Sequence, residues 1–162
     1  MKKSVVLILL VIAVFSCTRN PNVKNSAAHD QKSLELPLIP SVYISDQERG
    51  EYLAAHYWDR FDFGDTAYLS MPDLTEQAFA NYVGLLEQIP LEKGVAAVHR
   101  MLRQASADSA MFAHFSELYE KYLYDPNSPL RNDELYIPYL EYVVSSDKID
   151  ELNKLRPRAQ LD

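Results

Sequence analysis

Apolar residues recur at helical spacing along almost the whole chain from Ser45 onward, and this periodicity constrains the fold more than any other feature. In each expected helix the apolar side chains fall three or four positions apart, which places them on one face. No stretch alternates apolar and polar residues with strand period for more than a few positions, and the sequence has only four glycines. The pattern therefore predicts an all-α fold, a compact bundle of five or six short helices.

Capping residues and prolines set the expected ends of these helices. Ser45 and Glu48 form a capping-box pattern at the start of the first helix. Asp73 and Glu76 repeat this spacing at the start of the second, and Pro90 both ends that helix and can begin the third. We expect the second helix at about 73–88, the third after 90, the fourth at about 109–124, the fifth after 132 with a kink or late start at Pro138, and the sixth at 147–155, before Pro157.

The N-terminus carries a basic start and an unbroken apolar run from Val5 to Phe15. A helix of that length reaches only about 16 Å against a hydrocarbon core of about 30 Å, so the run suits a secretory signal rather than a membrane span. Ser16 and Cys17 follow at once, which resembles the lipobox of bacterial lipoproteins, where the chain is cut before a cysteine that receives lipid. We expect residues 1–16 to be a lipoprotein signal peptide, cleaved between Ser16 and Cys17. An ordinary secretory signal with a chance cysteine is the alternative.

Three segments are expected after the cleavage point. Residues 17–33 begin with the lipidated Cys17, hold almost nothing large and apolar, and predict a flexible tether. Residues 34–44 are apolar and contain Pro37 and Pro40, which disfavour helix and predict an extended strap lying against the domain. Residues 45–162 are expected to form the helical domain.

Charge and cysteine content exclude several functions. Without residues 1–16 the chain has 14 basic and 23 acidic residues, a net charge of −9. This charge repels phosphate backbones and anionic lipid surfaces, so we expect no nucleic-acid partner. The single cysteine of the sequence is Cys17, which leaves no disulfide, no CxxC redox pair and no further thiol nucleophile.

The segment 57–63 is dense in aromatic and charged residues. Because exposed Trp and Arg side chains are common anchors of contact sites, Trp58, Arg60 and Phe61 are candidates for an interaction surface. The alternative is a helix end whose rings fill the core while the Asp and Arg side chains pair locally.

The segment 122–136 raises the question of a calcium loop. An EF-hand loop needs glycine at its sixth position and glutamate at its twelfth, but counting from Asp125 these positions hold Leu130 and Tyr136. A shaped turn between helices accounts better for the sequence, with side chains that bond to nearby backbone groups and a cap for the next helix. The expected loop residues are Asp125, Asn127, Ser128, Arg131 as a brace and Asn132 as the cap.

Neither the histidines nor known motifs predict an active site. His29 lies in the tether, and His56, His99 and His114 lie on three different expected helices without i, i+4 pairing. The sequence has no glycine-rich phosphate loop, no GxSxG and no HExxH. We therefore predict no catalytic residue, no metal site and no cofactor, with a zinc site assembled in three dimensions as the alternative.

Three stretches resemble an uncharacterised helical domain of Bacteroidetes lipoproteins: YWDRFDFGDT at 57–66, KYLYDPNSPLRNDELYIPYLE at 121–141 and RPRAQL at 156–161. The resemblance covers roughly residues 40–162. In that family the helical domain follows a lipoprotein signal and precedes a thioredoxin-like domain related to peroxiredoxins and thiol-disulfide oxidoreductases. The resemblance carries over no catalytic residue, and the present sequence holds no thioredoxin-like part.

These observations favour a non-catalytic docking or accessory module in a membrane-anchored cell-envelope lipoprotein. A thioredoxin-like envelope protein is the expected partner. The residues after Cys17 are polar but not acidic, which favours a protein that faces the periplasm. The alternatives are the N-terminal half of an envelope thiol-disulfide oxidoreductase and a binding protein for a small ligand. If a second domain normally covers the helices, apolar side chains should be exposed at 34–43 and on the last helix.

Overall fold

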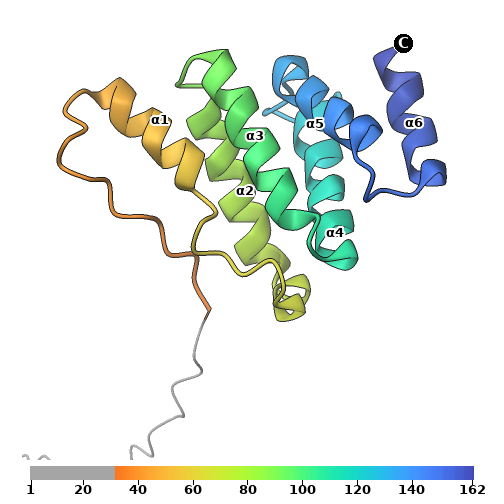
Figure 1. The fold of residues 1–162 in the computed structure, drawn as a ribbon, viewed down its shortest axis with the longest axis horizontal. Coiled ribbons are helices and arrows are strands. Elements are labelled where there is room, and N and C mark those ends of the chain that lie inside the picture. The colour runs from red at the N-terminus through yellow and green to blue at the C-terminus, as the bar shows by residue number, and fades with distance from the viewer. Residues whose placement is uncertain (1–31) are drawn as a thin grey trace, which may run out of the picture. The chain divides into compact units, whose positions relative to one another are not determined.

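The computed structural model describes residues 32–162, of which Ser33–Asp162 form one compact unit. The expected signal peptide, Ser16, Cys17 and nearly all of the tether lie outside the described residues and stay predictions. Every regular element in the described part of the chain is helical, which confirms the all-α bundle (Figure 1).

The described residues contain six α-helices, a 3₁₀-helical turn and a π-helical turn. They are α1 (Asp46–His56), η1 (Thr66–Ser70), α2 (Pro72–Leu86), α3 (Leu91–Ala105), α4 (Ser109–Tyr119), η2 (Glu120–Tyr124), α5 (Asp133–Ser145) and α6 (Glu151–Leu161).

The helices pack in two layers. α3 contacts α1 on one side and α5 on the other, and α5 in turn contacts α6. α2 and α4 lie behind this layer, where α2 contacts α1 and α4 contacts α3 (Figure 1). The strap and α1 therefore stand at one end of the compact unit, and α6 stands at the other.

The predicted capping box at α1 is confirmed. The Glu48 backbone N–H donates to the Ser45 hydroxyl at 3.2 Å, and the Ser45 N–H donates to the Glu48 carboxylate at 3.1 Å. The predicted cap of α2 is wrong, because that helix begins at Pro72 and its N-cap residue Met71 makes no side-chain bond. Proline is suited to the first helical position, since the N–H that it lacks would have no partner inside the helix.

Proline positions also explain the other differences from the expected helix ends. α5 begins at Asp133, capped by Asn132, and contains Pro138, so the late start is wrong. α6 begins at Glu151 and continues past Pro157 to Leu161, so the end predicted at 155 is wrong. The ring of Pro157 is buried, and this packing offsets the backbone donor that proline removes from the helix.

The fourth helix changes its hydrogen bonding before it ends. α-Helical geometry stops at Tyr119, and the π-helical turn η2 follows. The Asp125 N–H donates to the Glu120 carbonyl, five residues earlier, at 3.0 Å. A π-turn admits one more residue than an α-turn, so it changes the direction of the side chains that follow.

Aromatic rings fill the centre of the bundle. Trp58 contacts the rings of Tyr57, Phe61, Phe63, Tyr82 and Phe115. The apolar face of α2 is buried, as the helical spacing of the sequence predicts in general, with Phe79, Tyr82, Val83 and Leu86 turned inward. None of the helices in residues 32–162 is long and apolar enough to cross a membrane.

Candidate interaction surfaces

The last helix exposes leucines and buries a lysine. α6 buries Lys154 and Pro157 against the bundle but leaves Leu152 76% exposed and Leu155 59% exposed. The buried ammonium of Lys154 bonds to Glu151 at 2.8 Å. A helix normally turns its leucines inward. The face of α6 formed by Leu152, Leu155 and Ala159 is therefore uncovered; the sequence spacing places these residues on one face but does not show whether the bundle covers it.

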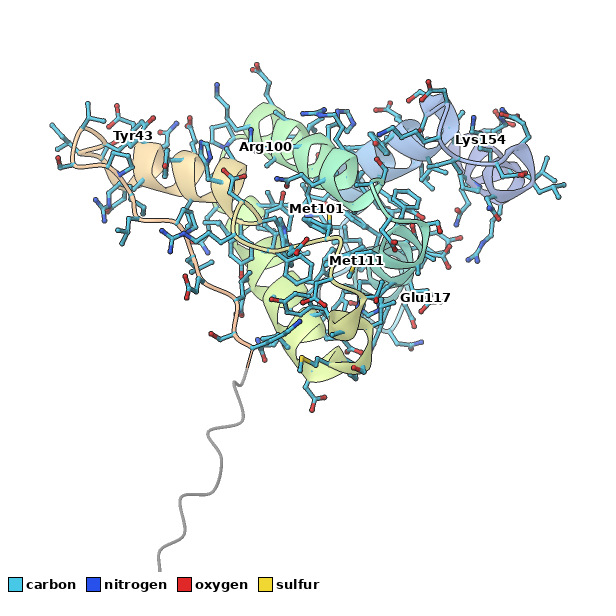
Figure 2. The ribbon with its side chains drawn as sticks, turned by 60° about the horizontal axis from the view of Figure 1, so that its bottom comes forward. Tyr43, Arg100, Met101, Met111, Glu117 and Lys154 are labelled. Atoms are coloured by element: carbon cyan, nitrogen blue, oxygen red, sulfur yellow. The ribbon has the colours of Figure 1, made fainter. Side chains whose placement is uncertain are left out.

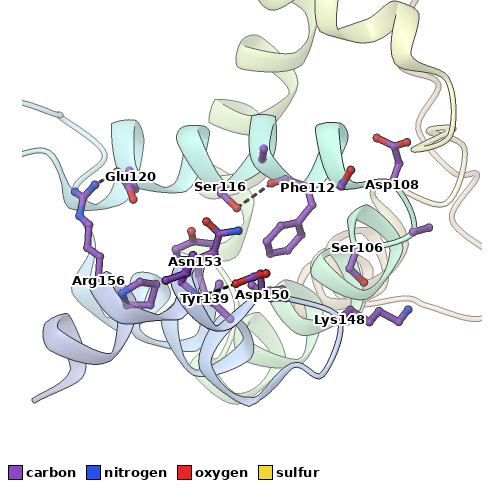
Figure 3. A pocket seen from close by; sticks show the side chains of 17 residues that line it. Ser106, Asp108, Phe112, Ser116, Glu120, Tyr139, Lys148, Asp150, Asn153 and Arg156 are labelled. Atoms are coloured by element: carbon purple, nitrogen blue, oxygen red, sulfur yellow. Dashed lines mark hydrogen bonds and ion pairs between the residues drawn. The ribbon is translucent and has the colours of Figure 1, made fainter.

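A groove of about 870 Å³ lies beside this helix. It runs between α4 and α6, and Figure 3 shows Phe112, Tyr139 and Asn153 along it. Val143 and Pro157 also line it, so much of its surface is apolar. The volume falls within the range of small-molecule pockets, but these walls also suit a side chain of a docked protein.

Charged groups stand at the two ends of the groove. At one end Arg156 of α6 pairs with Glu120 of η2 at 2.9 Å, which links the last helix to the π-turn (Figure 3). At the other end Asp108 and Asp150 accept backbone N–H groups as helix caps. These two carboxylates hold the starts of α4 and α6, and the carboxylate of Glu120 is held by Arg156.

The strap at 34–44 has an apolar outer side. It forms no regular element, and Leu36, Leu38, Val42 and Ile44 are exposed. Leu34 packs partly against the core, so the expectation that the strap lies against the domain holds only for part of its side chains. The exposed apolar side chains expected at the strap and the last helix are thus both present.

Besides Glu151 with Lys154 and Arg158 on α6, titratable side chains of the described residues meet in two further clusters, and both are ion-pair networks. Asp59 accepts from Arg100 at 2.9 Å and from His56 at 2.6 Å. Burial alone would raise the pKa of Asp59, but the bonds from His56 and Arg100 outweigh it and lower that pKa. The carboxylate therefore stays ionised and joins the end of α1 to α3.

The second cluster joins α2 to η2. Glu76 accepts from the Lys121 ammonium at 2.6 Å and the Tyr122 hydroxyl at 2.9 Å. The bond from Lys121 lowers the pKa of Glu76, and the same bond raises the pKa of Lys121. Both shifts favour the charged forms, so neither group is prepared to exchange a proton near neutral pH.

The histidines on the helices serve separate contacts. His99 bonds to the Pro138 carbonyl at 3.2 Å and His114 to the Thr75 hydroxyl at 2.9 Å. Burial lowers the pKa of His114. Among the described residues no group of three or more His, Cys, Asp or Glu side chains could hold a metal ion.

The interaction surface predicted at Trp58, Arg60 and Phe61 is wrong for its two rings. Trp58 is only 2% exposed and Phe61 is buried with it, because the chain after α1 turns these rings into the aromatic core. Arg60 remains on the surface and pairs with Glu35 of the strap at 3.0 Å. The two rings thus fill the core, as the alternative interpretation predicted. The Arg60 side chain pairs with the distant strap instead of with a local aspartate.

The sequence matches one family model over residues 16–162, that of a domain of unknown function, DUF5106. The chain belongs to the DUF5106 family. No curated protein matches this sequence.

The DUF5106 domain also has a similar solved structure. It is described as the crystal structure of a thioredoxin-like protein from Bacteroides caccae, with 42% sequence identity and a TM-score of 0.77. The match covers 80% of this chain and 47% of that chain, so this chain spans about half the length of the solved relative. A family of unknown function with a thioredoxin-like neighbour agrees with the coarser part of the resemblance, and the lipoprotein context stays a prediction.

The loop of the DUF5106 domain between η2 and α5 has the predicted local bonds. The Asp125 carboxylate accepts the Asn127 N–H at 2.8 Å, and the Ser128 hydroxyl donates to the Tyr122 carbonyl at 2.6 Å. Asn132 accepts the Leu135 N–H at 3.2 Å as the cap of α5. Arg131, expected as a brace of this loop, pairs with Asp133 of α5 at 3.5 Å.

Proposed function

We propose that the helical unit is a non-catalytic docking module that holds a thioredoxin-like domain or protein on the exposed face of α6. The observation that carries this proposal is the outward position of Leu152 and Leu155 on a helix whose buried side chains are a lysine and a proline. Fully burying an exposed leucine stabilises a complex by about 1.5–3 kcal/mol, so two adjacent leucines contribute substantially to the free energy of binding.

The surroundings of these leucines fit a protein partner. Arg156 and Arg158 flank them on α6, and the apolar groove opens beside them. An apolar centre within a charged rim is the usual composition of a protein interface. The solved relative, described as thioredoxin-like, is about twice as long as the matched part. Because every regular element among the described residues is helical, we assign its thioredoxin-like part to the unmatched half.

We further propose that this module works in a lipoprotein of the bacterial cell envelope, anchored through Cys17 and facing the periplasm. The support is the apolar run from Val5 to Phe15 followed at once by Ser16 and Cys17. Two or three acyl chains on Cys17 would hold the chain stably at a bilayer, whereas a single chain binds reversibly.

The alternative function is the N-terminal half of an envelope thiol-disulfide oxidoreductase. The thioredoxin-like description of the solved relative favours it. Sequencing the DNA downstream of codon 162 separates the two readings. An open frame encoding a CxxC-bearing thioredoxin-like segment supports the oxidoreductase, and an unrelated gene supports the separate docking module.

Docking is tested by titrating the chain from Thr18 onward with the unmatched half of the Bacteroides caccae protein in a calorimeter. We expect measurable binding, and we expect Leu152→Asp with Leu155→Asp to weaken it by at least about tenfold, because a charge in an apolar interface stays unpaired. Leu38→Asp with Ile44→Asp is the matched control at the other end of the unit and should bind as the parent does. Absence of binding heat, or equal loss in both variants, contradicts docking on α6.

Anchoring is tested by feeding cells an alkyne fatty acid and analysing the mature protein by mass spectrometry. The expected product starts at an acylated Cys17 and sediments with membranes. Cys17→Ser should carry no label and leave the membrane fraction. An unlabelled parent chain would remove the lipoprotein part of the proposal and leave the docking part to its own test.

A further inference from the structure

The strap contains a stretch without any charged residue. From Leu36 to Ile44 the sequence reads LPLIPSVYI, nine consecutive uncharged residues. Four of its side chains point away from the helices: Leu36 is 44% exposed, Leu38 82%, Val42 73% and Ile44 86%. A turn at 40–43, closed by the Tyr43 N–H bond to the Pro40 carbonyl, divides them into two pairs, Leu36 with Leu38 before the turn and Val42 with Ile44 after it.

The other side of the strap is fastened to the helical unit. Leu34 packs partly on the core, and the Tyr43 ring lies 4.8 Å from the ring of Tyr52 in α1. Glu35 pairs with Arg60. These contacts hold the segment along the unit and prevent the four aliphatic side chains from turning inward together.

The composition of this surface separates it from the docking face. Leucines on α6 stand among Glu151, Arg156 and Arg158, whereas no charge interrupts the strap from 36 to 44. The two surfaces also lie at opposite ends, as Tyr43 and Lys154 mark in Figure 2. An uncharged aliphatic surface suits the acyl boundary of a bilayer better than the polar rim of a protein contact.

We propose that the outer side of the strap is a second membrane contact, which places Leu36, Leu38, Val42 and Ile44 at the boundary between headgroups and acyl chains. This inference rests on the proposed anchoring at Cys17. Leu36 lies 19 residues after Cys17, and a chain of that length reaches at most about 65 Å even when fully extended. An anchored molecule therefore keeps its strap within that distance of the lipid surface, and this high effective concentration allows weak apolar contacts to seat it.

The backbone of the strap is suited to the boundary between lipid headgroups and acyl chains. Pro37 and Pro40 have no N–H group to desolvate. The Tyr43 N–H donates to the Pro40 carbonyl at 3.1 Å, and the Ile44 N–H donates to Glu48 at 3.3 Å. Because fewer backbone N–H groups lack a partner, less free energy is needed to desolvate the strap at the membrane interface. The remaining backbone groups stay hydrogen-bonded to water there.

Seating the strap on lipid has a consequence for the docking face. Because α6 lies at the opposite end of the unit (Figure 1), it would point away from the bilayer. A thioredoxin-like partner could then reach Leu152 and Leu155 without meeting the membrane.

The test uses the single cysteine of the sequence to supply the lipid chemically. The chain from Cys17 onward is coupled to a maleimide phospholipid in phosphatidylcholine vesicles, and a second sample is capped with a soluble maleimide. Hydrogen exchange followed by mass spectrometry then compares peptides that cover the strap and α6. We expect coupling to slow exchange in residues 34–44 by at least about fivefold and to leave α6 unchanged.

Two variants separate membrane contact from other causes. Leu38→Asp with Ile44→Asp should abolish the slowing, and both positions are exposed enough for the fold to tolerate the change. Leu152→Asp with Leu155→Asp is the matched control and should retain the slowing. Equal exchange of the strap in coupled and capped parent chains overturns the proposal. Protection that instead rises with the concentration of the capped chain also overturns it, because a second copy would then cover the strap.

Because the lipid is coupled chemically, the exchange experiment does not depend on whether cells acylate Cys17. A strap that is protected on vesicles while cells leave Cys17 unlabelled would refute only the anchoring. A labelled Cys17 with an unprotected strap would refute only the membrane contact.

Discussion

At the residue scale, the side chains of the segment after α1 show how burial decides between packing and recognition. Trp58 touches five rings that come from its own segment, from α2 and from α4. Edge-to-face pairs of this kind add to the effect of burial alone. Trp58 thus joins three parts of the chain and has no surface left for a partner.

Replacing Trp58 should lower the free energy of unfolding far more than replacing its charged neighbour Arg60. We expect Trp58→Ala to lower the free energy of unfolding by about 3–5 kcal/mol, because a large cavity opens in the core. Arg60→Ala removes an exposed ion pair with Glu35 and should cost less than about 1 kcal/mol. Urea denaturation followed by circular dichroism measures both. Equal small losses would mean that Trp58 is not the centre of the core.

Two tyrosines of the core differ in what their hydroxyl groups do. Tyr57 donates to the Ala78 carbonyl at 3.1 Å, while the buried hydroxyl of Tyr82 has no hydrogen-bond partner among the described residues. Tyr82→Phe should therefore raise the free energy of unfolding by about 1 kcal/mol, whereas Tyr57→Phe should lower it by a similar amount. The same denaturation experiment gives both values, and a loss at Tyr82 would reveal a partner for its hydroxyl, such as a buried water.

At the element scale, the helix starts depend on single polar side chains. Asn132 caps α5, and α5 in turn supports both α3 and α6. Asn132→Ala should lower the free energy of unfolding by about 1 kcal/mol, because one N–H at the start of α5 loses its acceptor. Asn127→Ala, in the same loop but outside any cap, is the control and should change stability by less than about 0.5 kcal/mol. Similar effects in both variants would contradict the capping role.

The element scale is also where sequence reasoning succeeded most. The Ser45 and Asn132 caps were predictable because each places an acceptor beside the backbone N–H groups that start a helix. The start of α2 and the end of α6 were not predictable. Pro72 occupies the first position of α2 and Pro157 is buried inside α6, and the sequence pattern alone does not show either role. A proline marks a probable helix boundary, and tertiary contacts decide each case.

At the scale of the whole molecule, buried tyrosines link stability to alkaline pH. Burial raises the pKa of Tyr57 to about 12 and raises the pKa values of Tyr82, Tyr119 and Tyr136 as well. In the unfolded chain these groups ionise near pH 10, so the folded state holds more protons above that pH. Their contribution to stability is complete below about pH 10 and is lost as the pH rises toward 12 and beyond.

Denaturation curves between pH 8 and 12 should therefore show a flat region followed by a steep fall. Each tyrosine contributes about 1.4 kcal/mol per pH unit to the fall. Tyr57→Phe should make the slope between about pH 10 and 12 shallower by that amount. Stability that stays level up to pH 12 would contradict the burial of these hydroxyl groups.

The candidate surfaces were only partly accessible to sequence reasoning. Exposed apolar residues at the strap and last helix were expected, and Leu38 and Leu152 confirm them. The groove was not expected, because it exists only where α4, α5 and α6 meet. Conversely, the aromatic and charged residues of 57–63 form a sequence pattern that is compatible with a contact surface and with a buried helix end. Spacing assigns residues to a helix face, but the neighbouring elements determine which face is covered.

The inverted last helix has a practical consequence for protein engineering. A fusion that joins a foreign cargo after Asp162 would leave two leucines in water unless the cargo brings its own matching apolar surface. Such a fusion should aggregate at concentrations where the Asp-substituted form stays dispersed. The eleven residues of α6 therefore restrict which domains can be joined behind them without aggregation.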